Sequence, residues 1–397
     1  MKIAILTSGI LPVPAVQGGA VEMLIDHYLD YNERHRLHDI TVYSVRHHGV
    51  ESCPQLQSTV NHYCYVDMAS LMAKARKRLH GMLHRNTYYH YSIDYFLQRA
   101  MTLIGSQRYD VILLENRPAY ALDIAGKTSA KLVYHLHNDF LNSQTPHAAD
   151  IYGAATGILT VSDYIRHRVE TCDRQHSAKC ITVHNGIDLA AFAHKPAIDR
   201  QALGFKSDDL ILAFSGRLVP EKGILELIEA MAMVSDLPRV KLLVMGSSFF
   251  GNAGMADPFI AQLKDKAGRL GDRITFSGYV RHELMPDYLK LADVAVIPST
   301  WGEPFATSVL EAMAAGLPIV TTNRGGIPEM VNDQCAISIN YPGPLANSLA
   351  TAIRQLHGDP ARRERMAKAS LQRSATFDKD TYAKDFFDAL AEVVATE

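Results

Sequence analysis

Short apolar segments alternate with longer amphipathic segments along most of this chain. The apolar segments have the length of β-strands and form two series. The first series comprises Ile3–Leu6, Ile40–Val45, Val111–Leu114, Leu132–Leu136, Gly157–Val161 and Ile181–Val183, and the second comprises Leu210–Phe214, Val240–Met245, Ile274–Phe276, Val294–Ile297 and Ile319–Thr321. Between strands of the second series, Ile224, Leu227, Ile228 and Met231 fall on one face of a helix. This alternation predicts two doubly wound domains, each a parallel sheet covered by helices on both faces.

Length and composition agree with two domains in a globular protein. The 397 residues are too many for one ordinary core, and the periodicity breaks within Asp188–Phe205, where we expect the domain boundary. A formal net charge of −2 gives no indication of a nucleic-acid partner. The five cysteines have no metal-type spacing and indicate reduced thiols in the cytoplasm. We expect no secretory signal at the N-terminus, and no apolar run approaches the roughly 18 residues of a membrane span.

Two glutamates follow the strand Val294–Ile297. Glu303 lies in the loop after this strand, and Glu311 lies inside the helix that begins near Ala306 and Thr307. A helix rises about 1.5 Å per residue, so the two carboxylates are roughly 10 Å apart. The first amides of that helix favour an anion such as a diphosphate. Glu303 can then accept hydroxyls of a sugar and Glu311 the hydroxyls of a ribose.

Two basic residues lie at the equivalent place in an earlier strand–helix unit. Arg217 and Lys222 belong to the segment SGRLVPEKG, between a strand and an amphipathic helix. In doubly wound folds this is the edge of the sheet where ligands bind. Two fixed cations can stabilise the negative charge of a diphosphate leaving group in place of a metal ion. Exposed basic residues at a helix start are common, so this reading depends on the glutamates in the same domain.

Taken together, the segment from Asp293 to Met330 and the segment SGRLVPEKG resemble the donor-binding signature of retaining glycosyltransferases of the GT-B fold (family four). The resemblance implies two Rossmann-like domains that face a central cleft. It implies an acceptor-binding domain over residues 1–190 and a nucleotide-sugar-binding domain over 191–378. It further implies that residues 379–397 form a helix packing back on the first domain.

The resemblance also assigns roles to individual residues. His137, which follows a strand in YHLHNDF, would contact the donor sugar, and with Glu303 it is a candidate catalytic residue. Because His135 and His137 alternate along a strand, we expect them to face opposite ways. The candidate donor-binding residues are Gly18, Gly19, Arg217, Lys222, Val280, Phe305, Ala306, Thr307 and Glu311. The pair Gly18–Gly19 allows close approach of the backbone to a ligand, without the fingerprint of a dinucleotide site.

Two further segments have expected roles outside the donor site. The segment Met68–Arg85 is basic and amphipathic, which is typical of a helix on an anionic membrane surface and equally of a helix covering the core. The acidic pair Asp378 and Asp380 stands at the start of the last expected helix, where such residues cap. We therefore expect no metal site and no cofactor.

The function expected from these features is transfer of a sugar, with retention, from a nucleotide diphosphate sugar (most simply a UDP-sugar) to a hydroxyl of a sugar or lipid-linked sugar acceptor. The resemblance suggests synthesis of cell-surface polysaccharide or glycolipid in the cytoplasm, at the inner face of the plasma membrane. Alternatives are a sugar-nucleotide isomerase or epimerase on the same fold, or a non-enzymatic sugar-nucleotide-binding protein. A retaining glycoside hydrolase is disfavoured, because it needs carboxylates about 5 Å apart.

Overall fold

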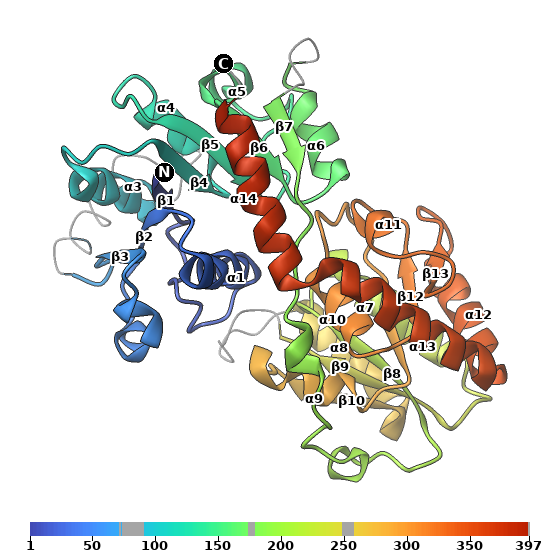
Figure 1. Cartoon of the computed structure of the whole chain (residues 1–397). Helices are drawn as coiled ribbons and strands as arrows, with labels where there is room; N and C mark the ends of the chain where they lie inside the picture. Colours follow the sequence, from blue (N-terminus) through green and yellow to red (C-terminus); the bar gives the residue numbers. More distant parts are fainter. Residues whose placement is uncertain (71–72, 74–90, 174–178, 248–257, 396–397) are drawn as a thin grey trace. The chain divides into compact units, whose positions relative to one another are not determined.

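The computed structural model describes residues 1–70, 73, 91–173, 179–247 and 258–395 (Figure 1). They form two compact units. Unit 1 comprises Met1–Gly186 and Lys379–Glu397, and unit 2 comprises Ile187–Asp378. The basic segment Met68–Arg85 lies largely outside the described residues, so its expected membrane contact stays a prediction. Among the helices that the structure describes, none is long and apolar enough to cross a membrane.

Unit 1 contains a seven-stranded parallel sheet in the order β3-β2-β1-β4-β5-β6-β7. Its strands are β1 (Lys2–Leu6), β2 (Asp39–Val45), β3 (Asn61–Val66), β4 (Val111–Glu115), β5 (Lys131–Leu136), β6 (Gly157–Thr160) and β7 (Cys180–Thr182). Its helices are α1 (Ala20–His35), α3 (Tyr91–Ile104), α4 (Ala121–Ile124), α5 (Ala148–Ala154), α6 (Asp163–Glu170) and α14 (Lys379–Ala395). The chain reverses its direction of winding between β1 and β4, which is the switch point of this sheet.

Apolar side chains cover both faces of this sheet. Ile3, Ile5 and Leu113 join α1 and α14 in one core cluster. Alternate residues of the same strands, such as Ala4 and Leu114, point to the opposite face and are also buried. The C-terminal helix α14 packs against α1, β5 and β6, as Figure 1 shows. This helix is therefore part of the core of unit 1, although it is the last segment of the chain.

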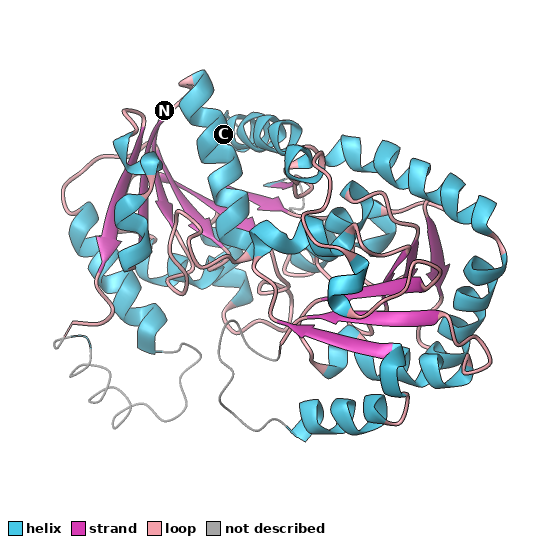
Figure 2. Ribbon diagram, turned by 90° about the horizontal axis from the view of Figure 1, so that it is seen from below, coloured by secondary structure: helices cyan, strands magenta, loops and turns pink. Residues whose placement is uncertain are grey.

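Unit 2 contains a six-stranded parallel sheet in the order β10-β9-β8-β11-β12-β13. Its strands are β8 (Leu210–Ser215), β9 (Val240–Met245), β10 (Ile274–Gly278), β11 (Val294–Ile297), β12 (Ile319–Thr322) and β13 (Ala336–Ile339). Its helices are α7 (Ile224–Met233), α8 (Pro258–Gly268), α9 (Met285–Leu289), α10 (Thr307–Ala314), α11 (Ile327–Met330), α12 (Leu345–Gly358) and α13 (Pro360–Ser374). Helices flank the sheet on both sides (Figure 2). The switch point of this sheet lies between β8 and β11.

Local sequence explains where one of these helices begins. Asp359 precedes α13, and its side chain accepts a hydrogen bond from the amide of Arg362. Pro360 follows at the first helical position, where the missing amide hydrogen costs no helical bond. Asp359 and Pro360 thus separate α13 from α12 within an otherwise continuous helical stretch.

The predicted fold class, two Rossmann-like α/β domains with parallel sheets, is confirmed. Two strands were not expected from the sequence. Both β3, with the sequence NHYCYV, and β13, with the sequence AISI, lie at an edge of their sheet. An edge strand has a neighbour on one side only and tolerates polar residues, which weakens the apolar signal on which the prediction relied.

Candidate functional site

The switch point of unit 2 brings together two loops that carry predicted site residues. The loop after β8 holds Arg217 and Lys222, and the loop after β11 holds Glu303. The amide of Thr300 donates to the carbonyl of Glu221 at 2.9 Å, which joins the loops. At Gly223 (φ +69°), an added Cβ would lie 2.0 Å from the carbonyl oxygen of Pro298. Glycine is needed here because the two loops touch.

Lys222 and Glu303 meet in this junction. The Lys222 ammonium forms an ion pair with Oε1 of Glu303. Oγ of Ser299 donates to the same oxygen at 2.6 Å. The Glu303 side chain is almost fully buried, whereas a fifth of the Lys222 side chain (19%) remains exposed. The sequence placed these two residues in one site but gave no indication that they pair.

Two consecutive glycines hold the backbone of Glu303 in place. The amide of Gly326 donates to the carbonyl oxygen of Glu303 at 2.7 Å. At Gly325, an added Cβ would lie 2.1 Å from that carbonyl oxygen and 2.4 Å from the Glu303 nitrogen. The segment RGG after β12 therefore supports the glutamate loop from behind, which sequence reasoning missed.

The helix α10 begins directly behind this loop. Its N-cap residue is Ala306, and among the described residues no side chain caps its first amides. Inside the helix, Glu311 is buried, and burial raises the pKa of its carboxyl to about 7. Nδ1 of His282 lies 3.5 Å from Oε1 of Glu311. An uncapped helix N-terminus attracts anions, and a carboxyl group one turn further can accept hydroxyl groups.

The other predicted residues of unit 2 have different surroundings. Arg217 is exposed, and the described part of the structure records no polar contact of its guanidinium. Val280 follows β10 and is buried. The Phe305 ring packs edge-on against Phe377, with ring centroids 5.7 Å apart. The side chain of Phe305 therefore serves the packing of unit 2, and its backbone leads into Ala306 and α10.

The predicted residues of unit 1 lie after β1 and after β5. Gly18 and Gly19 have φ values of +73° and +102°, and Gly19 is the N-cap of α1. Glu22 in the first turn of α1 is buried, and burial raises the pKa of its carboxyl to about 7. Oγ of Ser8 lies 3.3 Å from Glu22 Oε1. The glycine turn thus adopts the conformation that L-residues avoid.

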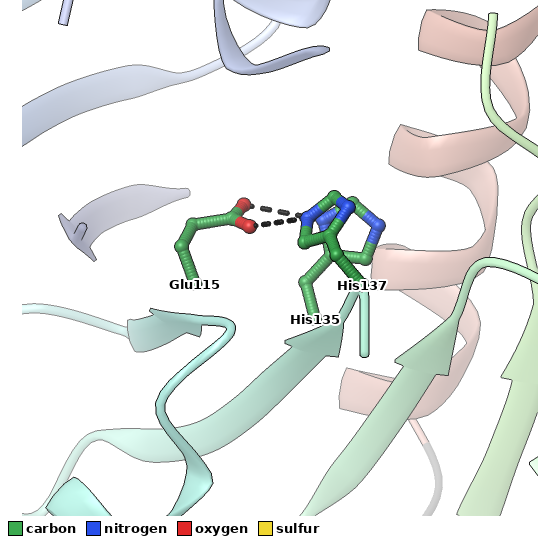
Figure 3. A group of neighbouring side chains, drawn as sticks. All are labelled: Glu115, His135 and His137. Carbon is green, nitrogen blue, oxygen red and sulfur yellow. Dashed lines mark hydrogen bonds and ion pairs between the residues drawn. The ribbon is translucent and has the colours of Figure 1, made fainter. Parts of the chain in front are cut away.

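His135 and His137 both contact Glu115, the last residue of β4 (Figure 3). Nδ1 of His135 lies 3.2 Å from one carboxylate oxygen, and Nε2 of His137 lies 2.9 Å from the other. The expectation that the two histidines face opposite ways is therefore wrong. Residues two apart along a strand point to the same side, so strand alternation itself places His135 and His137 on one face, and the expectation misapplied it. A glutamate at the end of the apolar segment VILLE was the signal that sequence reasoning missed.

Electrostatics keep this group of three in a defined state. Burial of Glu115 favours the protonated acid, but the imidazoles of His135 and His137 outweigh it and hold the pKa of Glu115 well below its usual range. Burial, together with the charge of His135, lowers the pKa of His137 to about 4. Tyr28 donates a further hydrogen bond to Glu115 at 2.8 Å. The three residues form one hydrogen-bonded cluster.

The same three residues also have the donor atoms of a metal site. One ligand atom each from Glu115, His135 and His137 lies within 4.8 Å of the others. However, each carboxylate oxygen already faces a different ring nitrogen at hydrogen-bonding distance, which satisfies the carboxylate without an ion. Of the acidic pair near the C-terminus, Asp380 forms a bidentate ion pair with Arg34 of α1.

Comparison with known proteins agrees with this architecture. Residues 197–373 match the family described as glycosyl transferases group 1. The chain is 27% identical over 383 residues to spore coat protein SA of Bacillus subtilis, covering 93% of each chain. It is also 27% identical over 279 residues to lipopolysaccharide 1,2-N-acetylglucosaminetransferase of Salmonella typhimurium, covering 70% of each.

Solved structures extend the similarity to the whole fold. The structure of Anabaena HepE with UDP and glucose aligns with a TM-score of 0.74 at 22% identity, covering 98% of this chain and 99% of that one. The GT-B fold class expected from the sequence is thus shown, with the family match lying in unit 2. The chain is thus similar in sequence to glycosyl transferases group 1 over residues 197–373 and similar in fold to HepE over nearly its whole length.

Proposed function

We propose that this protein is a retaining glycosyltransferase that moves a sugar from a nucleotide diphosphate sugar to an acceptor hydroxyl. The observation that carries the proposal is the contact of Lys222 with Glu303 at the switch point of unit 2. A cation after β8, a buried carboxylate after β11 and the uncapped start of α10 belong to the same switch point. This combination suits a ligand with a negative middle and hydroxyl groups at its ends.

Each group has a distinct part in the proposed reaction. Lys222 and Arg217, with the first amides of α10, hold the diphosphate and stabilise its charge as it leaves. Glu311 accepts the ribose hydroxyls, and Glu303 accepts hydroxyls of the sugar. We infer that these basic side chains replace a metal ion. The acceptor attacks from the face of the departing phosphate, and a phosphate oxygen takes its proton, so the configuration of the sugar is retained.

A UDP-sugar is the donor that we propose. HepE, which shares the fold, binds UDP and glucose in its crystal structure, and Val280 follows β10, where the resemblance locates the base. The name of the Salmonella relative supports an acceptor of the lipopolysaccharide or glycolipid class. We accordingly propose a role in cell-surface polysaccharide or glycolipid synthesis at the cytoplasmic face of the membrane.

Titration calorimetry and product analysis test this proposal. We expect UDP and UDP-sugars to bind in preference to GDP- and ADP-sugars, and an acceptor panel to show transfer with an unchanged anomeric configuration. A new sugar nucleotide formed from the donor alone would instead indicate an isomerase or epimerase. Tight binding without turnover on any acceptor would indicate a non-enzymatic binding protein.

The raised pKa of Glu311 predicts how donor affinity depends on pH. The ionised carboxyl accepts ribose hydroxyls better than the protonated acid, so binding favours the ionised form. With a pKa of about 7 in the free protein, the ionised fraction grows about tenfold from pH 6 to pH 8. Affinity for UDP-glucose, which has no titrating phosphate in this range, should rise by about the same factor.

Two variants separate Glu311 from its neighbour in this experiment. Glu311→Gln should bind UDP-glucose with little pH dependence, since the amide does not titrate. His282→Asn removes the imidazole that lies 3.5 Å from Glu311 and should retain the rise in affinity. A wild-type affinity that falls or stays constant between these pH values would contradict the assigned contact.

A further inference from the structure

Glu115 accepts hydrogen bonds from three side chains and donates none. Its two oxygens face Nδ1 of His135, Nε2 of His137 and the hydroxyl of Tyr28 at 3.2, 2.9 and 2.8 Å. The carboxyl is fully buried, and its low pKa keeps it ionised. An ionised carboxylate only accepts, so the ring nitrogens that face it must carry protons.

This arrangement fixes the tautomer of His137. A neutral imidazole carries one N–H, and the lowered pKa keeps this ring neutral near pH 7. Because Nε2 holds the proton that bonds to Glu115, Nδ1 is left with a lone pair. The backbone of His137 is also held, since its amide donates to the Asn116 side chain at 3.2 Å. Both the position and the protonation state of the ring are thereby set.

The lone pair on Nδ1 of His137 accepts no hydrogen bond from the described residues. This atom is buried and has no hydrogen-bond partner among the described residues. A buried acceptor without a donor costs free energy, and such groups are often completed by a ligand. Nε2 of His135 is also unpartnered, but His135 lies within β5 and packs against Phe386 of α14, with ring centroids 5.3 Å apart. His137 lies past the carboxyl end of β5, the edge at which ligands reach a parallel sheet.

We propose that Glu115 is a positioning residue that holds His137 as the Nε2–H tautomer, so that Nδ1 accepts a hydrogen bond from a hydroxyl of a bound sugar. The sugar contact rests on the proposed function, whereas the tautomer is a property of the free protein. His137 is then an acceptor that orients the sugar and not a general acid. The hydroxyl can belong to the transferred sugar or to the acceptor, and the kinetic experiment below distinguishes the two.

Nitrogen NMR of the protein with labelled histidines tests the proposed tautomer of His137. Signals of His137 are identified by their loss in His137→Asn. We expect the wild type to show protonated Nε2 and bare Nδ1, and Glu115→Gln to show mixed tautomers, because an amide both donates and accepts. Asp39→Asn is the matched control, since Asp39 pairs with the exposed His62 and its change should leave the His137 signals unaltered.

Steady-state kinetics test the proposed contact of His137 with a sugar hydroxyl. We expect Glu115→Gln to lower kcat by roughly two- to tenfold, as the fraction of His137 in the Nε2–H tautomer falls, with little change in donor KM. Glu115→Asp, which keeps an anionic acceptor, should recover most of the loss. Hydrolysis of the donor without acceptor then locates the hydroxyl. If the hydroxyl belongs to the donor sugar, Glu115→Gln lowers the rate of hydrolysis as well as the rate of transfer. If the hydroxyl belongs to the acceptor, the variant hydrolyses the donor at the wild-type rate.

Several results would overturn the inference. A wild-type His137 with its proton on Nδ1 would do so, as would unchanged turnover in Glu115→Gln. A metal ion that stays bound in stoichiometric amount after dialysis and shifts the His137 signals would make Glu115 a ligand instead of a hydrogen-bond acceptor. A wild type that binds no sugar nucleotide would overturn the proposed function and the sugar contact together, whereas an Nδ1–H tautomer overturns this inference alone.

Discussion

Replacing Lys222 with alanine should lower kcat/KM for the sugar nucleotide by about 100-fold or more. In the proposed reaction, its ammonium stabilises charge on the leaving diphosphate, and removal of one such group typically costs a factor of about 100 to 1000. The change also leaves the buried Glu303 carboxylate with Ser299 as its remaining donor in this cluster. An uncompensated buried charge is destabilising, so the thermal midpoint should fall as well. Initial rates and thermal unfolding give the two quantities.

Lys241→Ala is the control for this experiment. Lys241 also has a largely buried side chain in an ion pair of unit 2, with Asp272 at 2.9 Å, but it lies in β9, away from the switch-point loops. The Lys241→Ala change should lower the thermal stability without lowering kcat/KM of the folded protein. Lys222→Arg keeps the charge and should keep part of the activity. Equal effects of Lys222→Ala and Lys241→Ala on kcat/KM would show that Lys222 has a structural role only.

Replacing Gly325 with alanine should weaken UDP binding at least tenfold, although Gly325 contacts no ligand in the proposed site. Its new Cβ would lie 2.1 Å from the carbonyl oxygen of Glu303, so this backbone must move. The start of α10 follows directly at Ala306 and moves with it, which displaces the amides assigned to the diphosphate. Displaced groups lose their alignment with the ligand, and a shift of about 1 Å can cost a factor of about 100 in rate. Calorimetry with UDP and initial rates measure the two effects.

Gly271→Ala is closely matched to this change. Gly271 has the same φ of +60° and lies in the same unit, and no heavy atom of the described residues lies within 4 Å of an added Cβ. Both variants carry the strain of a left-handed alanine, about 1–2 kcal/mol, and only Gly325→Ala carries the clash. Gly271→Ala should therefore be slightly less stable than the wild type and bind UDP with the wild-type affinity. Normal UDP binding by Gly325→Ala would contradict the assigned role of the Glu303 loop.

Much of the fold could be predicted from the sequence because the central strands are buried on both faces. Segments such as Ile3–Leu6 and Val294–Ile297 are continuous apolar runs for this reason, and the structure has them as β1 and β11. The strands β3 and β13 lie at a sheet edge, where burial on both faces is not required, and the sequence did not predict them. Alternation of apolar runs with helical periodicity was enough to predict two parallel sheets.

The candidate site was less predictable, because it depends on contacts between distant segments. Motif spacing placed Lys222 and Glu303 in one domain, but 80 residues separate them, and their ion pair follows from the adjacency of β8 and β11. The same holds for Glu115 with His137, and for Gly325 behind Glu303. In each case the sequence identifies the strand end, and the strand order decides which ends meet.

Hydrogen exchange in the presence of UDP tests the central claim most directly. The claim is that the switch point of unit 2 holds a nucleoside diphosphate. Saturating UDP should slow exchange of backbone amides in residues 215–223 and 299–311, with uridine giving much less protection because it lacks the diphosphate. Unchanged exchange in both segments, or protection by UDP confined to other parts of the chain, would contradict the account.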